Sequence, residues 1–221
     1  MTAHVADVGS RKLVLGITGN IASGKSTVVG MLKERGVIHL DGDLVYRELV
    51  QPGMPLLNEL VAHFGEGILA EDGSLNRSAL GKIVFSDPAE LQALDRITHP
   101  AIIAEIDRRA DAVTEGVVVI DAVKLIESGH ADHCDVVWVV TIDPNLQVTR
   151  LMNRNRLDAL EAKRRVDAQA PMEPKLARAD FVIDNSGSLD ETRRQVDAAW
   201  QALPIAASSP ATATSSAKGH S

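Results

Sequence analysis

The stretch GNIASGKS, residues 19–26, most constrains what this chain can fold into. It fits the phosphate-binding pattern G-x-x-x-x-G-K-[ST], and it lies between an apolar run at 13–17 and a predicted helix at 26–35. A loop between a strand and a helix N-terminus directs backbone N–H groups and the helix dipole toward phosphate. This context favours a nucleotide-binding α/β protein over a glycine-rich turn that carries a surface lysine.

The fixed positions of the loop have distinct expected roles. Gly19 and Gly24 allow a tight backbone path close to phosphate oxygens. We expect Lys25 to be a solvent-facing cation that reaches the terminal phosphates, and the Ser26 hydroxyl to ligate Mg²⁺. The full set of expected nucleotide contacts in the loop is Gly19, Asn20, Ala22, Ser23, Gly24, Lys25, Ser26 and Thr27.

Composition narrows the possible partners and compartment. The chain has 221 residues with 23 Lys+Arg against 30 Asp+Glu, and the net charge of −7 disfavours nucleic acid or an anionic membrane as partner. Its one cysteine, Cys134, excludes an internal disulfide and precedes an apolar run, so we interpret it as a core residue rather than a nucleophile. No apolar run is long enough to span a bilayer and no signal peptide is evident, which predicts a soluble, cytoplasmic protein.

Short apolar segments rich in Val and Ile predict strands at 13–18, 37–40, 117–121, 136–141 and 181–183. They lack strict alternation, as expected for parallel strands covered on both faces. The alternation of these strands with helices predicts an α/β fold with a doubly wound five-stranded parallel sheet. Helix starts are marked by Asp87, followed by Pro88 and Glu90, and by the capping box that Ser188 and Glu191 form.

We expect one folded domain at 12–203, flanked by disordered segments at 1–11 and 204–221, which lack the apolar content for a core. Within it, the predicted core comprises 12–42, 116–148 and 170–203. The long, mostly helical gap at about 43–115 predicts an inserted substrate-binding region, and about 149–169 is the candidate lid.

Acidic residues follow the second and third predicted strands, at the sheet edge where ligands bind in open parallel sheets. Asp43 and Arg47 lie one helical turn apart, so they share a helix face. Asp41 is expected to cap that helix or to support a turn. Asp121 ends the run VVVID, and it is either a structural residue or a carboxylate on the Mg²⁺ side of the site.

Two further motifs leave alternatives open. His99-Pro100 lies between two predicted apolar helices, and it is either a helix break or part of the site. The basic segment 150–165 is either a solvated helix face with a Glu161–Arg165 pair or a lid whose arginines close over phosphates. We favour the lid, because Asp158 is placed to begin a new helix just after the basic run.

An ordered set of segments resembles the dephospho-coenzyme A kinase family along nearly the whole folded length. It comprises GNIASGKST, DGDLVYRELVQPG (41–53), FGEGILAEDGSLNRSALGKIVF (64–85), His99-Pro100, Leu151-Met152-Asn153-Arg154, Ala168-Gln169 and ADFVIDNSG (179–187). The loop alone is generic, whereas the ordered set is specific. The resemblance implies a phosphate-loop nucleotide-kinase core, a helical acceptor-binding domain and a mobile lid.

The resemblance also implies an activity, namely ATP- and Mg²⁺-dependent phosphorylation of the ribose 3′-hydroxyl of dephospho-coenzyme A, the last step of coenzyme A biosynthesis. Asp43 matches the general base, which would act with the catalytic Lys25 and the lid residue Arg154. Arg47 and His99 match positions near the acceptor or phosphates. Asn185 matches a position near the adenine. No nucleic-acid or membrane partner is implied, and we expect a monomer.

This chain departs from the family pattern at two places. Asn20 and Ala22 stand where the family usually has glycines, which is harmless if their backbone angles are allowed. Val123-Lys124 replaces the usual Pro-Leu after the third strand. Lys124 at the sheet edge either binds acceptor phosphate or points into solvent.

Two other functions are compatible with a phosphate loop. One is a different small-molecule kinase on the same core, acting on shikimate or a nucleoside monophosphate. The other is a nucleotide-dependent switch, although neither the guanine motif N-K-x-D nor the transporter motif L-S-G-G-Q occurs in the sequence.

Overall fold

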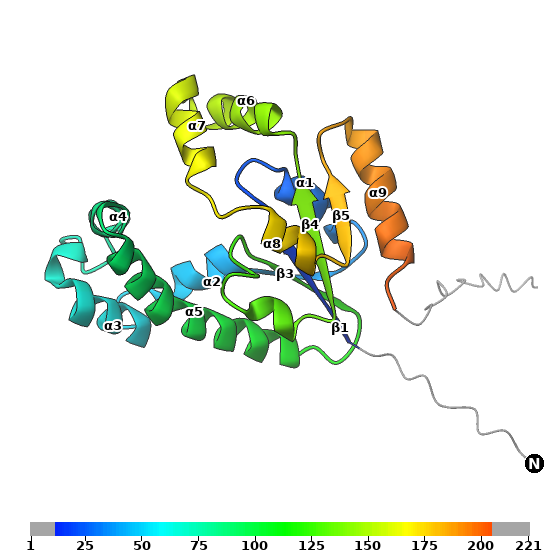
Figure 1. Cartoon of the computed structure of the whole chain (residues 1–221). Coiled ribbons are helices and arrows are strands. Elements are labelled where there is room, and N and C mark those ends of the chain that lie inside the picture. Colours follow the sequence, from blue (N-terminus) through cyan, green and yellow to red (C-terminus); the bar gives the residue numbers. More distant parts are fainter. Residues whose placement is uncertain (1–11, 205–221) are drawn as a thin grey trace, which may run out of the picture.

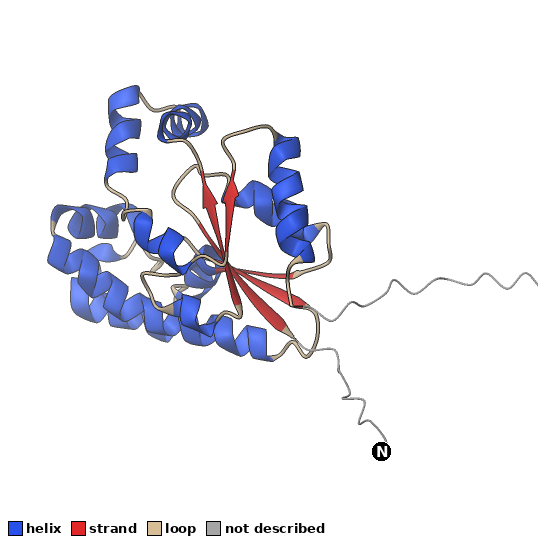
Figure 2. Ribbon diagram, turned by 45° about the vertical axis from the view of Figure 1, so that its right-hand side comes forward, coloured by secondary structure: helices blue, strands red, loops and turns tan. Residues whose placement is uncertain are grey.

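Within residues 12–204, which the computed structural model describes, a single sheet contains five strands that all run parallel. The order across the sheet is β2-β3-β1-β4-β5. Figure 2 shows the strands fanning through the molecule with helices on both faces. The predicted α/β class and parallel sheet are confirmed. The strands are β1 (Leu13–Thr18), β2 (Ile38–Asp41), β3 (Val117–Asp121), β4 (Val136–Thr141) and β5 (Phe181–Asp184).

The central strand β1 explains why the strands are apolar without alternation. Every residue of β1 and β3 is buried. Because successive side chains of a strand point to opposite faces, Leu15 and Val14 enter different cores. Leu15 packs in a cluster with residues of α1 (Lys25–Lys33) and α9 (Leu189–Gln201), whereas Val14 packs in a cluster with residues of α5 (Pro88–Asp111). Helices therefore cover both faces of the sheet.

Between β2 and β3 the chain is almost wholly helical, as predicted. The elements are α2 (Gly42–Leu49), α3 (Pro55–Phe64), the 3₁₀ helix η1 (Glu66–Ile68), α4 (Arg77–Ser86) and α5. They enclose a third hydrophobic cluster of their own, in which Leu60 and Ile68 are fully buried. Figure 1 shows α3 and α4 projecting to one side of the sheet. The region therefore has a core separate from the two cores of the sheet.

His99-Pro100 does not break a helix, so the helix-break alternative is wrong. α5 runs through both residues, with Pro100 inside it. Proline removes one backbone hydrogen bond from a helix interior. Packing on both sides of the proline offsets this loss, because α5 is buried at Ala93 and Thr98 before it and at Ile106 and Ala110 after it.

Beyond β4 the chain forms α6 (Pro144–Asn155), α7 (Ala159–Asp167) and α8 (Glu173–Arg178). In Figure 1, α6 and α7 lie above the carboxyl ends of β4 and β5. The Asp158 carboxylate accepts a 2.8 Å hydrogen bond from the Glu161 N–H, so α7 begins where the sequence predicts. The Glu161–Arg165 ion pair expected of a solvated helix face is also present, at 2.9 Å.

The predicted helix starts at Asp87 and Ser188 and the predicted burial of Cys134 agree with the structure. Asp87 caps α5, and Ser188 with Glu191 forms the capping box of α9. Cys134 is buried, and burial raises the pKa of its thiol to about 12, as expected for a core residue. The segment 1–11 and residues 205–221 of the predicted tail lie outside the described residues.

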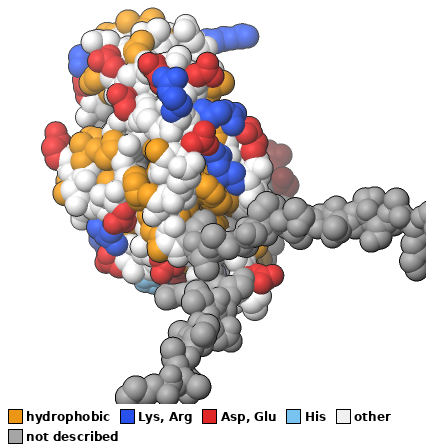
Figure 3. Space-filling view, turned by 90° about the vertical axis from the view of Figure 1, so that its right-hand side faces the viewer, with side chains coloured by type: hydrophobic (Ala, Val, Ile, Leu, Met, Phe, Trp, Pro, Cys, Tyr) orange, Lys and Arg blue, Asp and Glu red, His pale blue; other side chains and the backbone are white. Residues whose placement is uncertain are grey.

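The described surface mixes charges of both signs. On the face shown in Figure 3, basic and acidic side chains are interspersed. Ion pairs connect separate helices, such as Arg193 of α9 with Glu34 at the end of α1, 2.7 Å apart. None of the helices in residues 12–204 has the length and hydrophobicity needed to cross a membrane.

Candidate active site

The loop after β1 leads directly into the N-terminus of α1. Gly24 is the N-cap of α1 and has a left-handed backbone with φ 89°, and no side chain bonds to the cap. The first amide groups of α1 are therefore available to an anion, and the helix dipole favours one there. This geometry fits phosphate binding.

Asn185, which follows β5, forms a hydrogen bond to the phosphate loop. Its amide Nδ2 donates a 2.8 Å hydrogen bond to the Ser23 carbonyl, and its Oδ1 accepts one from Thr192 at the same distance. Asn185 is 5% exposed, and a Cβ on Gly24 would collide with its Nδ2. Asn185 thus supports the loop directly, a contact that sequence alone did not predict.

Asn20 and Ala22, the two loop residues that depart from the expected pattern, differ in backbone conformation. Ala22 has φ 59°, in the left-handed region, whereas Asn20 is not among the non-glycine residues with positive φ. An L-residue in the left-handed region costs roughly 1–2 kcal/mol. A glycine at position 22 would avoid this strain, while Asn20 is accommodated without it.

Lys25 is not the solvent-facing cation that the sequence predicts. Its side chain is 19% exposed, and its ammonium forms an ion pair with Asp121 at the end of β3. Burial lowers the pKa of Lys25, and the charges of Asp43 and Asp41 oppose that shift. His39 Nε2 lies 3.4 Å from the other carboxylate oxygen of Asp121, so the carboxylate is shared by two partners.

α2 orients the acidic residues after β2. Asp41 caps α2 by accepting hydrogen bonds from the Asp43 and Leu44 N–H groups, as the sequence predicts. Asp43 follows in the first turn and is exposed. Its side chain is therefore free of the cap and can face a substrate. Arg47 is also exposed on α2, but it is not among the residues that line the two cavities described next.

One cavity of about 830 Å³ gathers the predicted nucleotide-binding residues. Asp43 and Arg154 lie in its wall together with Asn185 and the whole loop. A second cavity of about 310 Å³ adjoins α2 and α5, and its wall includes Asp43, His99 and Lys124. Asp43 therefore borders both cavities, which is the position required of a group that acts between two substrates.

In the second cavity, Asp95 already pairs with both predicted basic residues. Lys124 Nζ lies 2.6 Å and 2.7 Å from the two carboxylate oxygens of Asp95. His99 Nε2 lies 3.4 Å from the same carboxylate. Burial lowers the pKa of His99, Asp95 opposes the shift, and Lys124 adds to it. Lys124 thus neither points freely into solvent nor offers an unpaired charge.

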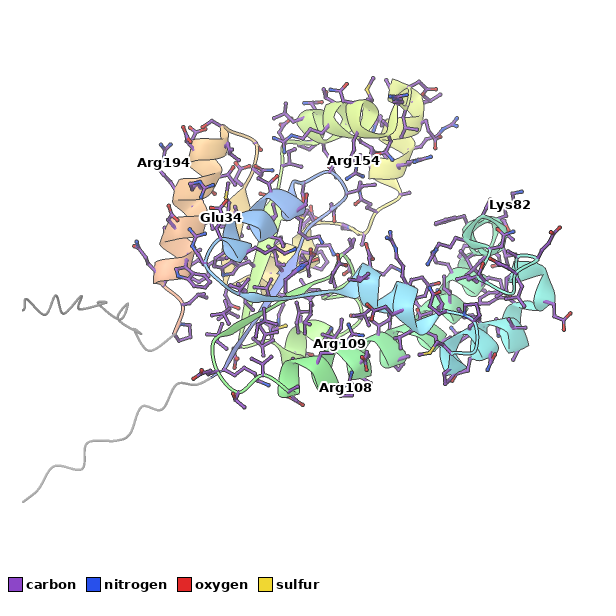
Figure 4. All side chains as sticks on the ribbon, turned by 180° about the vertical axis from the view of Figure 1, so that it is seen from behind. Glu34, Lys82, Arg108, Arg109, Arg154 and Arg194 are labelled. Atoms are coloured by element: carbon purple, nitrogen blue, oxygen red, sulfur yellow. The ribbon has the colours of Figure 1, made fainter. Side chains whose placement is uncertain are left out.

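Residues in and just before the candidate lid bond to the loop and to Asn185. Gln169 Oε1 accepts a 2.6 Å hydrogen bond from the Ile21 N–H, and Gln147 Nε2 donates one of 2.8 Å to the Ile21 carbonyl. Arg150 donates to the Asn185 carbonyl at 2.9 Å. Arg154, labelled in Figure 4, lines the larger cavity from α6. The sequence assigned no individual role to the first three.

Sequence patterns mark some of the contacts that were not predicted. His39 lies two residues before Asp41 on β2, so strand alternation places both on one face. His39, Asp41 and Asp121 have potential ligand atoms that all lie within 4.8 Å of one another. Gln169 belongs to the Ala168-Gln169 motif. The contacts of Gln147 and Arg150 depend on tertiary packing, and no local pattern marks them.

The residues present fit ATP and Mg²⁺ chemically. The loop supplies backbone donors and a lysine for phosphate, in a cavity large enough for a nucleotide. Ser26 offers a hydroxyl and Asp121 a carboxylate, the oxygen donors that Mg²⁺ prefers. Asp121, however, is 8% exposed and is occupied by Lys25 and His39.

Sequence comparisons agree on one family. The dephospho-CoA kinase family model matches residues 13–191. The dephospho-CoA kinase of Symbiobacterium thermophilum is 48% identical over 192 residues, which cover 86% of this chain and 80% of that protein. The dephospho-CoA kinase of Geobacter sulfurreducens is 46% identical over 191 residues, covering 85% and 96% of the two chains.

Solved structures are similar to this chain in fold. A crystal structure from Thermus thermophilus has a TM-score of 0.74 and 33% identity, covering 87% of this chain and 98% of the other. Dephospho-CoA kinase from Campylobacter jejuni has a TM-score of 0.56 and 26% identity, covering 86% and 96%. A shikimate kinase from Bacteroides thetaiotaomicron, at 13% identity and a TM-score of 0.53, shares the fold.

Proposed function

This chain belongs to the dephospho-CoA kinase family, and on that basis we propose which residues bind each substrate and which act in phosphoryl transfer. The enzyme uses ATP to phosphorylate dephospho-coenzyme A in the final step of coenzyme A biosynthesis. The larger cavity holds ATP, with its phosphates on the loop and on the N-terminus of α1. The smaller cavity, between α2 and α5, holds part of the acceptor.

Asp43 is the general base, and its position between the two cavities is the observation that carries this assignment. It accepts the proton of the acceptor 3′-hydroxyl as that oxygen attacks the γ-phosphorus. Asp41 keeps the first turn of α2 in place by capping it. The Asp43 carboxylate is thereby held in the wall of both cavities.

Positive charge stabilises the transferring phosphoryl group. Lys25 and Arg154 supply it from the loop and the lid, as expected for a reaction in which positioning and electrostatics provide most of the catalysis. Ser26 and Asp121 are the residues that would hold Mg²⁺, which neutralises phosphate charge when bound. Asn185 fixes the loop and borders the nucleotide cavity.

Arg47, His99 and Lys124 are assigned to the acceptor, within the insertion at about 43–115 and at the adjoining sheet edge. The segment at about 149–169 is the lid. We propose that the enzyme acts in the cytoplasm as a monomer. The described surface, with its mixed charges, suits a small-molecule enzyme rather than a nucleic-acid-binding protein.

Coupled ATP turnover with dephospho-coenzyme A tests the proposal. Adenosine, AMP and shikimate serve as alternative acceptors. Turnover that requires dephospho-coenzyme A, with a kcat/KM at least about 10²-fold above the other acceptors, supports it. Preference for shikimate or AMP would indicate another kinase, and slow ATP hydrolysis without acceptor stimulation would indicate a nucleotide switch.

A further inference from the structure

Two histidines and an aspartate meet near the amino-terminal edge of the sheet, remote from the phosphate loop. Asp107 and His133 line a cavity of about 690 Å³ together with Lys12 and Asp135, which directly precede β1 and β4. In an open parallel sheet, substrates bind at the opposite, carboxyl edge. The cluster of Asp107, His130 and His133 therefore lies at the edge of the sheet opposite the phosphate loop, although His130 also borders the smaller cavity.

The local fold brings these three side chains together. His130 and His133 are the first and last residues of the 3₁₀ helix η2 (His130–His133). Side chains three residues apart eclipse one another in a 3₁₀ helix, so the two imidazoles lie on one side. α5 presents Asp107 to them. His130 Nε2 lies 3.0 Å from Asp107 Oδ1, and His133 Nδ1 lies 2.7 Å from Asp107 Oδ2.

The three side chains of the cluster differ in how far they are buried. The His130 side chain is 2% exposed, while Asp107 is 32% and His133 is 50% exposed. His130 is thus fixed by packing, and His133 leaves an open path from solvent. A transition-metal site needs both features, namely a ligand that is held in advance and a route of entry.

We propose that Asp107, His130 and His133 form a binding site for Zn²⁺ or a similar transition-metal ion. Their ligand atoms all lie within 4.8 Å of one another. Tetrahedral coordination by nitrogen and oxygen at ordinary Zn²⁺ bond lengths requires separations of roughly 3.3 Å, so small side-chain shifts suffice. Imidazole nitrogens with one carboxylate favour Zn²⁺ over Mg²⁺ or Ca²⁺. Water from the adjoining cavity can complete the coordination.

The bound ion would connect α5 to the segment that follows β3. His130 also lines the cavity that contains Asp43 and His99. The metal therefore joins two elements that the fold otherwise holds together by the Asp107–histidine hydrogen bonds and by core packing. Its binding stabilises the folded state, because the site requires the tertiary structure.

Isothermal titration of the full chain with ZnCl₂, and visible absorption of the Co²⁺-substituted protein, measure the site directly. We expect one saturable site with a tetrahedral Co²⁺ spectrum and an increase in Tm on Zn²⁺ addition. His133→Ala should weaken Zn²⁺ binding by about 10²-fold or more and abolish the Co²⁺ spectrum, because it removes a ligand. Since His133 is half exposed, this variant should fold.

The matched control is His63→Ala. His63 also lies 3.0 Å from a carboxylate, that of Glu90, with 40% exposure, but it belongs to no three-residue cluster among the described residues. This variant should bind Zn²⁺ as the original chain does. Equal Zn²⁺ affinity in the original chain and His133→Ala would overturn the proposal. So would an absence of saturable binding, or a loss of binding confined to His39→Ala, which would place the ion beside Asp121.

Discussion

The side-chain amide of Asn185 lies where a Cβ on Gly24 would have to be. Gly24 also has a left-handed backbone that alanine adopts only at a cost. The phosphate loop and the segment after β5 are thus fitted to one another across the sheet edge. Asn185 bonds to the Ser23 carbonyl only because position 24 carries no side chain.

Gly24→Ala should lower the free energy of unfolding by about 1–2 kcal/mol from backbone strain alone. It should also raise KM for ATP, because Asn185 must move away from the loop. Gly30→Ala is the control, since Gly30 lies within α1 with no atom near its added Cβ. That change should stabilise the protein by about 0.5–1 kcal/mol. Chemical denaturation and ATP kinetics measure both variants, and equal effects would contradict the packing argument.

Lys25→Met should lower kcat by about 10²-fold or more, because a fixed positive charge at the phosphates is lost. It should also lower the free energy of unfolding by about 1–3 kcal/mol, since the buried Asp121 carboxylate loses its ammonium partner. The double variant Lys25→Met/Asp121→Asn should recover part of the stability without the activity. Near-normal kcat in the single variant would refute the loop assignment.

Asp43→Asn should lower kcat by roughly 10²–10⁴-fold with little change in ATP affinity, because the amide cannot accept the hydroxyl proton. Asp41→Asn makes the same charge change two residues earlier and keeps a good helix cap, so its kcat should fall far less. Steady-state kinetics with both substrates compare the two. If ATP affinity collapses while kcat holds, Asp43 serves the metal or the fold instead.

The Lys124–Asp95 pair offers a test of the acceptor site. If Lys124 binds acceptor phosphate, Lys124→Leu should raise KM for dephospho-coenzyme A and leave KM for ATP unchanged. Asp95→Asn should act in the opposite direction, because it releases Lys124 from the ion pair. Measurements at low ionic strength maximise the contrast, since salt screens exposed charges. Unchanged acceptor KM in both variants would leave Lys124 a surface residue.

Cys134 should resist thiol reagents in the folded protein. Burial raises its pKa to about 12, so almost no reactive thiolate exists at about pH 8. Iodoacetamide labelling followed by mass spectrometry should show modification only after denaturation. Rapid labelling of the native chain would show that the segment before β4 opens.

Local patterns account for most of what the sequence predicted. β1, the loop and α1 are contiguous, so spacing and apolar runs are enough to identify them. β2 is shifted by one residue from its predicted position, Ile38–Asp41 instead of 37–40, because Asp41 both ends β2 and caps α2. The helix-break alternative at Pro100 is wrong because the packing that keeps α5 continuous comes from residues distant in sequence.

Contacts between distant segments are what the sequence could not provide. Lys25 appeared solvent-facing because its partner Asp121 is on another strand. Lys124 was expected either to bind acceptor or to point into solvent, whereas Asp95 pairs with it from α5. Such pairings depend on how elements pack, which residue spacing within one segment does not encode.

Ile21 has both backbone polar groups bonded to side chains that bracket the candidate lid, Gln147 just before it and Gln169 at its end. Any displacement of either glutamine must break a hydrogen bond at the centre of the phosphate loop. We therefore expect nucleotide binding and movement of the candidate lid to be linked through this one peptide segment.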